Sequence, residues 1–229
     1  MIFLKRTKPI VVRLYTDTPN AYRLFAPKLS SDLKPSWLSE KDDTARACTG
    51  LKKMFNSGFG IPLWSDLDMN TTINDRNEVD GDFKFSDKEN YLELQRQRTS
   101  AIPQSKICMK LLSPWCAECD EEVNFIATEN MWGNPSRNVE FLSGVADFKY
   151  QHATHMFFYM DKKAGHTQIN AGDVPVLWLP QSERKLVIEA FYDPDKYKYF
   201  AYLCNMPPFR NFVYAKTRSA LLGQTRTSP

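Results

Sequence analysis

The chain has 229 residues, of which 42 % are aliphatic or aromatic, so it is long enough to close a hydrophobic core. Thirty basic residues against 27 acidic ones leave a net charge of +3, which argues against nucleic acid as the main partner. Nine glycines argue against a glycine-rich nucleotide-binding chain, whereas 14 prolines and 13 % aromatic residues suit a loop-rich β protein.

Neither a membrane span nor a secretory signal is expected. The chain contains no run of about 18 apolar residues, which a spanning helix needs. Its start, MIFLKRTKPIVV, lacks a long apolar segment followed by small residues. The odd number of five cysteines fits free thiols in a reducing cytosol, or in a particle that is assembled there and later released.

The first 41 residues are interpreted as a strand followed by an extended arm. Residues 10–15 are apolar and β-branched, which predicts the strand. Residues 17–36 are polar and contain three prolines, which predicts an extended or looped segment. Trp37 and Leu38 are expected to pin this arm onto the body of the protein, with a partner contact as the alternative.

One helix is predicted in the N-terminal half. The acidic and hydroxyl side chains of residues 42–44 can accept hydrogen bonds from the free N–H groups of a first helical turn. Cys48, Leu51 and Phe55 then share one helical face. Gly58 follows as a glycine typical of a helix C-terminus.

The body, residues 42–192, is predicted to be a β-sandwich or jelly roll. Strand-like runs recur roughly every 10 to 20 residues, with Pro and Asn between them, as in all-β domains. Residues 80–82, Asp-Gly-Asp, are expected to form a hairpin turn between two short strands. The predicted strands are 59–69, 107–112, 123–127, 141–148, 156–160, 174–179 and 186–192.

Residues 193–229 are predicted to form a helical extension that is rich in basic and aromatic side chains. Asp193 and Pro194 are typical of a helix start, and Pro207-Pro208 would stop the helix. A mixture of basic and aromatic residues fits a packed helix or an arm that docks on a neighbouring subunit better than a nucleic-acid site, because the overall charge is nearly balanced. The expected buried face consists of Tyr197, Phe200, Ala201 and Cys204.

The segment Trp115-Cys116-Ala117-Glu118-Cys119 matches the Trp-Cys-x-x-Cys motif of thiol oxidoreductases. Three acidic residues follow it, and they would raise the pKa of a nearby thiol rather than lower it. No strand-helix-strand pattern surrounds the motif. A structural zinc site needs four ligands, usually in two pairs, and Cys108 and Cys204 stand alone. Buried thiols are therefore expected at Cys116 and Cys119, and metal ligation is the alternative left open.

A hydrolytic triad could be assembled from Ser143, Asp147 and either His152 or His155. The chain has no Gly-x-Ser-x-Gly elbow to carry the nucleophile, so we do not predict hydrolysis. Ser143-Gly144 within a strand is instead typical of a bulge or a tight bend, and His166 is interpreted as a turn residue. Side chains three residues apart in a strand point to opposite faces, so His152 and His155 are poorly placed to bind the same metal ion. We predict no catalytic, cofactor-binding or metal-ligating residues, and a chain that is not an enzyme.

Four short motifs occur in order: residues 47–51 continuing to 58–66, then 112–115, 142–147 and 169–176. Together they resemble a family of uncharacterised proteins encoded by tailed, chiefly T4-like, bacteriophages and also found in some bacterial genomes. The resemblance covers roughly Pro35 to Ile188 and offers no catalytic residues. The Gly172 to Val176 step is also similar to a late strand of the trimeric dUTPase-like jelly roll, whose catalytic motifs the chain lacks.

The resemblance implies a phage-encoded protein. We expect a non-enzymatic structural component of a tailed phage virion, in the head, neck, tail or baseplate, that is assembled in the host cytoplasm. It would be oligomeric in the particle and contact other virion proteins through its two terminal segments, which would gain order on assembly. The alternatives are a phage-encoded jelly-roll enzyme, either nucleotide-modifying or metal-dependent, and a host-directed binding protein.

Overall fold

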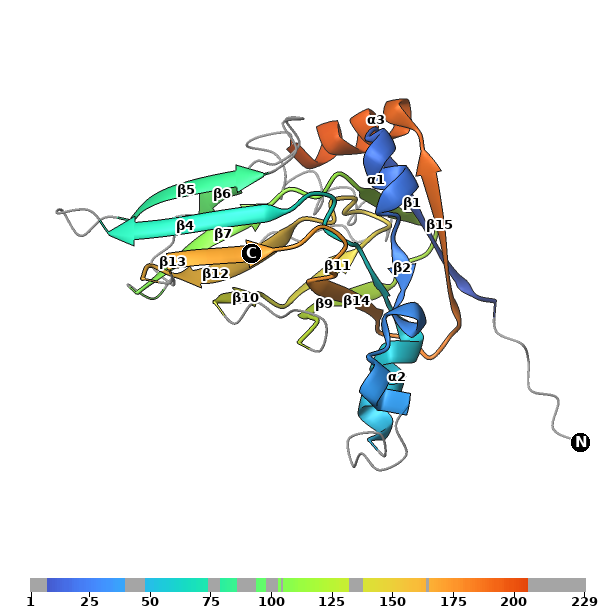
Figure 1. Ribbon diagram of the computed structural model, residues 1–229. Coiled ribbons are helices and arrows are strands. Elements are labelled where there is room, and N and C mark those ends of the chain that lie inside the picture. The colour runs from blue at the N-terminus through green and yellow to red at the C-terminus, as the bar shows by residue number, and fades with distance from the viewer. Residues whose placement is uncertain are drawn as a thin grey trace, which may run out of the picture.

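A computed structural model describes residues 8–39, 48–73, 79–85, 94–97, 103, 105–131, 138–163 and 165–205. In this part of the chain the protein is mainly β, with four sheets and three α-helices (Figure 1). The predicted sandwich-like fold with few helices is therefore confirmed. No described helix combines the length and the hydrophobicity needed to cross a lipid bilayer.

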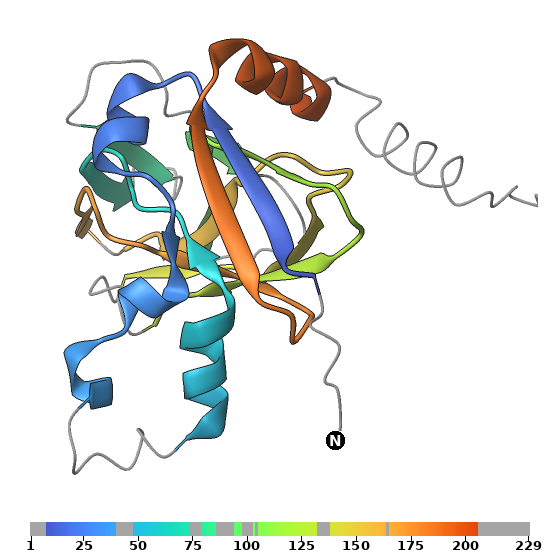
Figure 2. The ribbon, with the colours of Figure 1, turned by 90° about the vertical axis from the view of Figure 1, so that its right-hand side faces the viewer.

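The sheet that carries the candidate site joins three distant parts of the chain. Its central strand β1 (Ile10–Thr16) lies between β15 (Leu186–Tyr192) and β8 (Cys116–Cys119). β1 runs parallel to β15, with Ile10 opposite Leu186, and antiparallel to β8. Figure 2 shows β1 and β15 side by side along their whole length. The even-numbered residues of β1 are completely buried, so this face of the sheet covers the core.

The other three sheets have the strand orders β11-β9-β14-β3-β2, β10-β12-β7-β6 and β13-β4-β5. All nine pairs of neighbouring strands in these three sheets are antiparallel. Their strands are β2 (Lys28–Leu29), β3 (Phe59–Gly60), β4 (Leu67–Ile73), β5 (Val79–Phe85), β6 (Leu94–Gln97), β7 (Lys106–Leu111), β9 (Asn124–Glu129), β10 (Val139–Phe141), β11 (Gly144–Asp147), β12 (Met156–Asp161), β13 (Gly165–Ile169) and β14 (Val176–Pro180).

All four sheets contribute to one hydrophobic core. Leu14 of β1, Phe125 of β9, Phe158 of β12 and Met69 of β4 are completely buried in the same cluster. Burial of each large apolar side chain contributes about 1.5–3 kcal/mol to the free energy of folding. The strands predicted over 107–112, 123–127, 156–160, 174–179 and 186–192 are confirmed within two residues at each end.

The described part of the predicted arm, residues 8–39, belongs to the body. The predicted loop over 17–36 contains the helix α1 (Pro19–Leu24), which begins with a proline, and the 3-10 helix η1 (Ser30–Leu33); η2 (Ser36–Ser39) follows it. Proline is tolerated in a first helical turn because its missing N–H has no partner there. α1 contacts β1 and β15, so these residues are partly helical and packed on the body rather than extended.

The predicted N-terminal-half helix is confirmed as α2 (Thr49–Ser57), which lies on the side of the body opposite α1 and α3 (Figure 1). Phe55 is completely buried and packs in one cluster with Leu38, as expected of both. Cys48 is the N-cap residue and is exposed, so its assignment to the buried helical face is wrong. The start signal proposed at residues 42–44 lies outside the described residues.

Two predictions between residues 59 and 85 are wrong. Residues 80–82 lie inside β5, where Gly81 pairs with Thr71 of β4, so they form no hairpin turn. The predicted strand 59–69 is two strands, β3 and β4, interrupted at 61–66. In both places the ladder with a neighbouring strand, rather than local composition, fixes the boundary.

The predicted C-terminal helix is confirmed as α3 (Pro194–Asn205). Asp193 caps it: its carboxylate accepts a hydrogen bond from Lys196 N at 3.0 Å, and its carbonyl accepts one from Tyr197 N at 3.0 Å. The stop at Pro207-Pro208 and the second helical segment at 211–222 lie outside the described residues.

Candidate functional site

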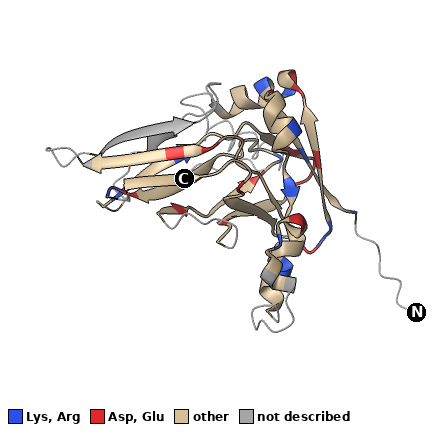
Figure 3. Ribbon diagram, viewed as in Figure 1, with Lys and Arg blue, Asp and Glu red and all other residues tan. Residues whose placement is uncertain are grey.

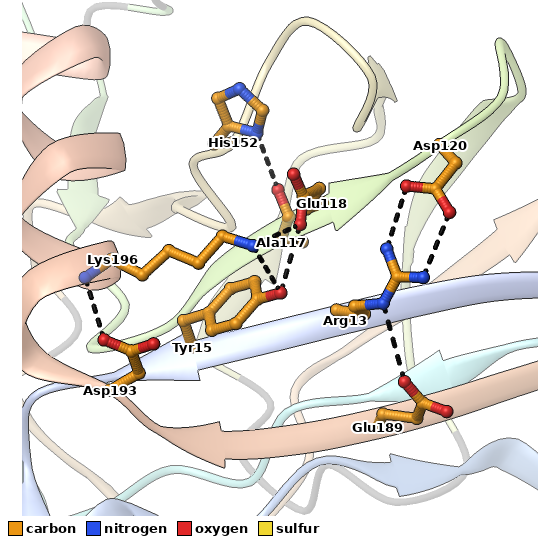
Figure 4. Close-up of polar contacts among 9 residues, drawn as sticks. All are labelled: Arg13, Tyr15, Ala117, Glu118, Asp120, His152, Glu189, Asp193 and Lys196. Atoms are coloured by element: carbon orange, nitrogen blue, oxygen red, sulfur yellow. Dashed lines mark hydrogen bonds and ion pairs between the residues drawn. The ribbon is translucent and has the colours of Figure 1, made fainter.

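The outward face of the β15-β1-β8 sheet carries a row of charged side chains. Odd-numbered residues of β1 point to this face, because side chains alternate along a strand. Arg13 donates to both carboxylate oxygens of Asp120, at 2.8 and 3.0 Å, and its Nε lies 3.6 Å from Glu189 of β15 (Figure 4). The hydrogen bonds from Arg13 lower the pKa of Asp120. Arg13 thus ties all three strands together through their side chains.

A second polar group on the same face holds α3 against the sheet. Lys196 Nζ donates to Glu118 Oε2 and to the Tyr15 hydroxyl, both at 2.8 Å, and that hydroxyl donates to the same carboxylate oxygen at 3.0 Å (Figure 4). Burial opposes the charge of Lys196, but its bonds to Glu118 and Tyr15 prevail and raise its pKa. Burial raises the pKa of Tyr15. Lys196 is therefore charged and Tyr15 neutral at physiological pH.

Aromatic packing completes the attachment of α3. Phe200 of α3 is buried with Tyr15 and Cys116, and the imidazole of His152 stacks on its ring at 4.0 Å between centroids. Nδ1 of His152 donates to the Ala117 carbonyl at 2.9 Å, which fixes the tautomer of the neutral ring. The predicted buried face of the C-terminal helix is confirmed in this contact.

Protonation of His152 is expected to destabilise this attachment. Burial lowers the pKa of His152 below its ordinary value of 6.5, while Glu118 opposes and Lys196 reinforces that shift. The folded chain therefore favours the neutral ring. As pH falls below about 6.5, the unfolded chain takes up the proton first, so the free energy of unfolding decreases. Hydrogen exchange of the α3 amides, corrected for intrinsic rates, should show faster opening at about pH 5 than at about pH 8.

His152→Gln is the matched control for this pH effect, because glutamine can donate to the Ala117 carbonyl but does not titrate. Its α3 amides should exchange with a much smaller pH dependence. A wild-type chain whose α3 protection is the same at both pH values would contradict the assignment.

Cys116 and Cys119 are buried thiols, as predicted. They lie on opposite faces of β8: Cys119 is in the main core, and Cys116 is under α3. Burial raises the pKa of both thiols, which makes thiolate chemistry unfavourable. The two cysteines lie in strand β8, from which Ala117 and Cys119 point into the core. Among the described residues, no group of three or more His, Cys, Asp or Glu side chains is arranged to hold a metal ion.

Three of the four residues considered for a hydrolytic triad, Asp147, His152 and His155, have hydrogen-bond partners outside that set. Ser143 is exposed, and a carboxylate oxygen of Asp147 accepts a hydrogen bond from Lys149 N at 3.1 Å. His155 Nδ1 accepts from Ser113 N at 3.2 Å, whereas His152 Nδ1 bonds to the Ala117 carbonyl, so the two histidines have different partners. The single strand predicted over 141–148 is wrong: β10 and β11 belong to different sheets, and Ser143 lies in the break between them rather than in a bulge within one strand.

His166 lies in strand β13, so its interpretation as a turn residue is wrong. Its Nε2 lies 3.0 Å from a carboxylate oxygen of Asp68 on the paired strand β4, and both side chains are exposed.

Aromatic side chains at the surface surround the attachment of α3, and they form what we call the aromatic patch. Phe191 stacks on Tyr15 at 5.4 Å, Tyr15 contacts Phe200 at 5.8 Å, and Phe200 contacts Tyr199 at 5.6 Å, so the rings form a continuous series. Tyr192 points to the opposite face of β15 from Phe191, and there its ring lies 6.3 Å from Tyr22 of α1, so these two rings are not part of the patch. The exposed members of the patch are Phe191 (39 %), Tyr199 (60 %) and Tyr202 (64 %).

Only part of this patch could be anticipated. The aromatic and basic composition of the α3 segment was predicted, whereas the exposure of Phe191 was not. The exposure of Phe191 depends on which strand forms the edge of the sheet, and no residue spacing reveals that. Figure 3 shows Lys and Arg interspersed with Asp and Glu over the described elements in this view, without a face of one sign.

No protein-family model matches the chain, and no curated protein and no solved structure is significantly similar to it.

Proposed function

We propose that this protein is a structural component of a tailed-phage particle and acts through contacts with other subunits. The observation that supports this most directly is the aromatic patch. Exposed aromatic rings of β15 and α3 lie on one face of the β15-β1-β8 sheet, around the attachment of α3. Tyrosine and phenylalanine are enriched at protein interfaces, because they bury a large area at a low cost in side-chain entropy. The phage context rests on the resemblance of the short sequence motifs.

The ionisable groups beside the patch serve the same purpose by positioning it. Arg13, Glu118 and Lys196 are each bound to partners within the chain. Their ion pairs hold β15, β1, β8 and α3 in a fixed arrangement, so that the aromatic rings are presented in one geometry. A preorganised surface binds more tightly, because fewer side chains are ordered on association.

The proposed docking surface differs from that expected from the sequence. The described N-terminal residues lie within the body, where β1 is a central strand. We therefore assign subunit contacts to the aromatic patch, to which α3 contributes, and no longer to a free N-terminal arm.

The test is quantitative mass spectrometry of purified particles, with wild type and variants supplied in trans. The wild-type chain should be present at a fixed copy number. Tyr199→Ser combined with Tyr202→Ser should lower incorporation severalfold without changing the thermal unfolding of the free chain. Val145→Ser is the matched control, because Val145 is equally exposed but lies on β11 of another sheet. Absence of the wild-type chain from the particles would refute the proposal.

A further inference from the structure

Strand β15 has one side that no strand of the described chain pairs with. Ile10 N donates to Lys185 O at 2.8 Å, and Asp193 N donates to Thr16 O at 3.0 Å at the other end of the ladder. In a parallel ladder the bonded residues alternate. The odd-numbered residues of β15 therefore bond to β1, and the backbone groups of Leu186, Ile188, Ala190 and Tyr192 point to the free side.

The free side of β15 is unusual among the sheet edges of this part of the chain. Natural sheets protect their edges by short strands, charges or coverage. The edge strands β2, β6, β8, β10, β11 and β13 have two to five residues, and the edge strand β5 has Asp80, Asp82 and Lys84 in its sequence. The outer side of β8 is also covered, since Ala117 N donates to His152 O at 2.7 Å.

β15 has none of these protections over most of its length. It has seven residues, LVIEAFY, of which Glu189 is the only charged one. α1 lies near its C-terminal end, where Tyr22 approaches Tyr192. The segment from Leu186 to Ala190 is thus an apolar strand edge with outward N–H and C=O groups, which is the surface that β-strand addition uses.

The charge pattern of this edge makes it complementary to itself. Antiparallel pairing of two copies about Ile188 places Val187 opposite Glu189 of the second copy, and it brings exposed Lys185 diagonal to that same Glu189. Centring on Glu189 instead would set two like charges directly opposite each other, which is unfavourable. Across the centre, Ile188 would face its own copy on the core side, where Leu186 and Ala190 continue the apolar surface.

We propose that a second copy of this chain pairs with the free edge of β15, antiparallel and centred on Ile188, to form one continuous sheet across a twofold axis. Such an isologous contact uses the same surface on both copies and closes without further growth. The dimer deepens the proposed function, because it identifies a second copy of the chain as one partner of this structural subunit. Dimerisation can be tested in the isolated chain, independently of that function.

The test is sedimentation of the full chain over a range of concentrations, with variants at the edge. Wild type should sediment at twice the 26.5 kDa mass of one chain. Ala190→Pro removes one outward N–H without removing a bond to β1, and it should weaken dimerisation by tenfold or more. Ala190→Ser keeps the N–H and should remain dimeric. A wild-type monomer at every concentration would overturn the proposal.

Lys185→Glu is a second variant for the case that proline at 190 prevents folding. Lys185 is exposed, so the substitution leaves the core intact. At each of two symmetry-related positions, the substitution replaces the attraction between Lys185 and Glu189 of the second copy with a repulsion between two carboxylates. We therefore expect about tenfold weaker association. An unchanged dissociation constant would refute the stated register.

Hydrogen exchange separates the possible occupants of the edge. Protection of the Ile188 and Ala190 amides in the isolated dimer supports the second copy. Protection of those amides only in purified particles would overturn the proposal in favour of a strand from another virion protein. A chain that dimerises in solution but is absent from particles would refute the proposed function and support the dimer. A chain that is incorporated into particles but is monomeric in solution would support the proposed function and refute the dimer.

Discussion

Phe148→Ala is expected to lower the free energy of unfolding by about 3–5 kcal/mol, the usual cost of deleting a buried phenylalanine. Phe148 is completely buried. Its ring centroid lies 5.0 Å from Phe125, 5.3 Å from Trp178 and 6.1 Å from Phe59. These rings come from β9, β14 and β3, so Phe148 fills the space that three strands enclose, and rigid neighbours cannot collapse into the cavity.

Urea denaturation measures this change, with tryptophan fluorescence as the signal, because Trp178 lies in the same cluster. Val145→Ala is the control: Val145 lies three residues away on β11 and is 61 % exposed, and its substitution should change stability by no more than about 0.5 kcal/mol. If Phe148→Ala lost as little as the control, the aromatic cluster would not be the centre of the core.

Local sequence patterns were sufficient to predict most of the strands but not their partners. The runs at 10–15 and 186–192 are apolar and β-branched, and both form strands. Nothing in either run indicates that they pair in parallel, with Ile10 opposite Leu186. Parallel pairing over such a sequence separation is decided by burial in the common core, which a local window of residues does not contain.

The errors have the same origin. Residues 17–36 were assigned to a loop because proline interrupts regular structure, yet a proline at residue 19 also starts a helix well, and contact with β15 decides between the two. The strand β8 (Cys116–Cys119) was not among the predicted strands. The pairing of Leu14 with Ala117 shows that its residues complete a ladder.

The candidate site was beyond the reach of spacing arguments. Tyr15, Glu118 and Lys196 come from a strand, a second strand and a helix, and each is an ordinary residue in its own segment. Only the fold brings them together. The exposed rings of Phe191 and Tyr192 are equally hidden in the sequence, since an apolar strand looks the same in the centre of a sheet and at its edge.

Gly58→Ala is expected to lower the free energy of unfolding by about 1–3 kcal/mol, as overpacking of a dense site does. Gly58 follows the C-terminus of α2, as predicted, but its backbone is extended (φ −122°, ψ −171°), a conformation that any residue can adopt. The need for glycine comes from a close approach. A Cβ atom there would lie 2.7 Å from the carbonyl oxygen of Trp178 and 2.5 Å from Leu179 Cδ2. The backbone oxygen cannot move without disturbing β14.

The same residue is fixed from its other side, so the chain cannot retreat from the added methyl group. Gly58 N donates to Ser30 Oγ at 2.9 Å, and Ser30 N donates to Gly58 O at 2.8 Å, which links α2 to η1. Gly144→Ala is the matched control, because a Cβ atom at Gly144 meets nothing within 4 Å. Urea denaturation of the two variants should differ by at least about 1 kcal/mol; equal stability would mean that the junction of α2 with β14 is loose rather than tightly packed.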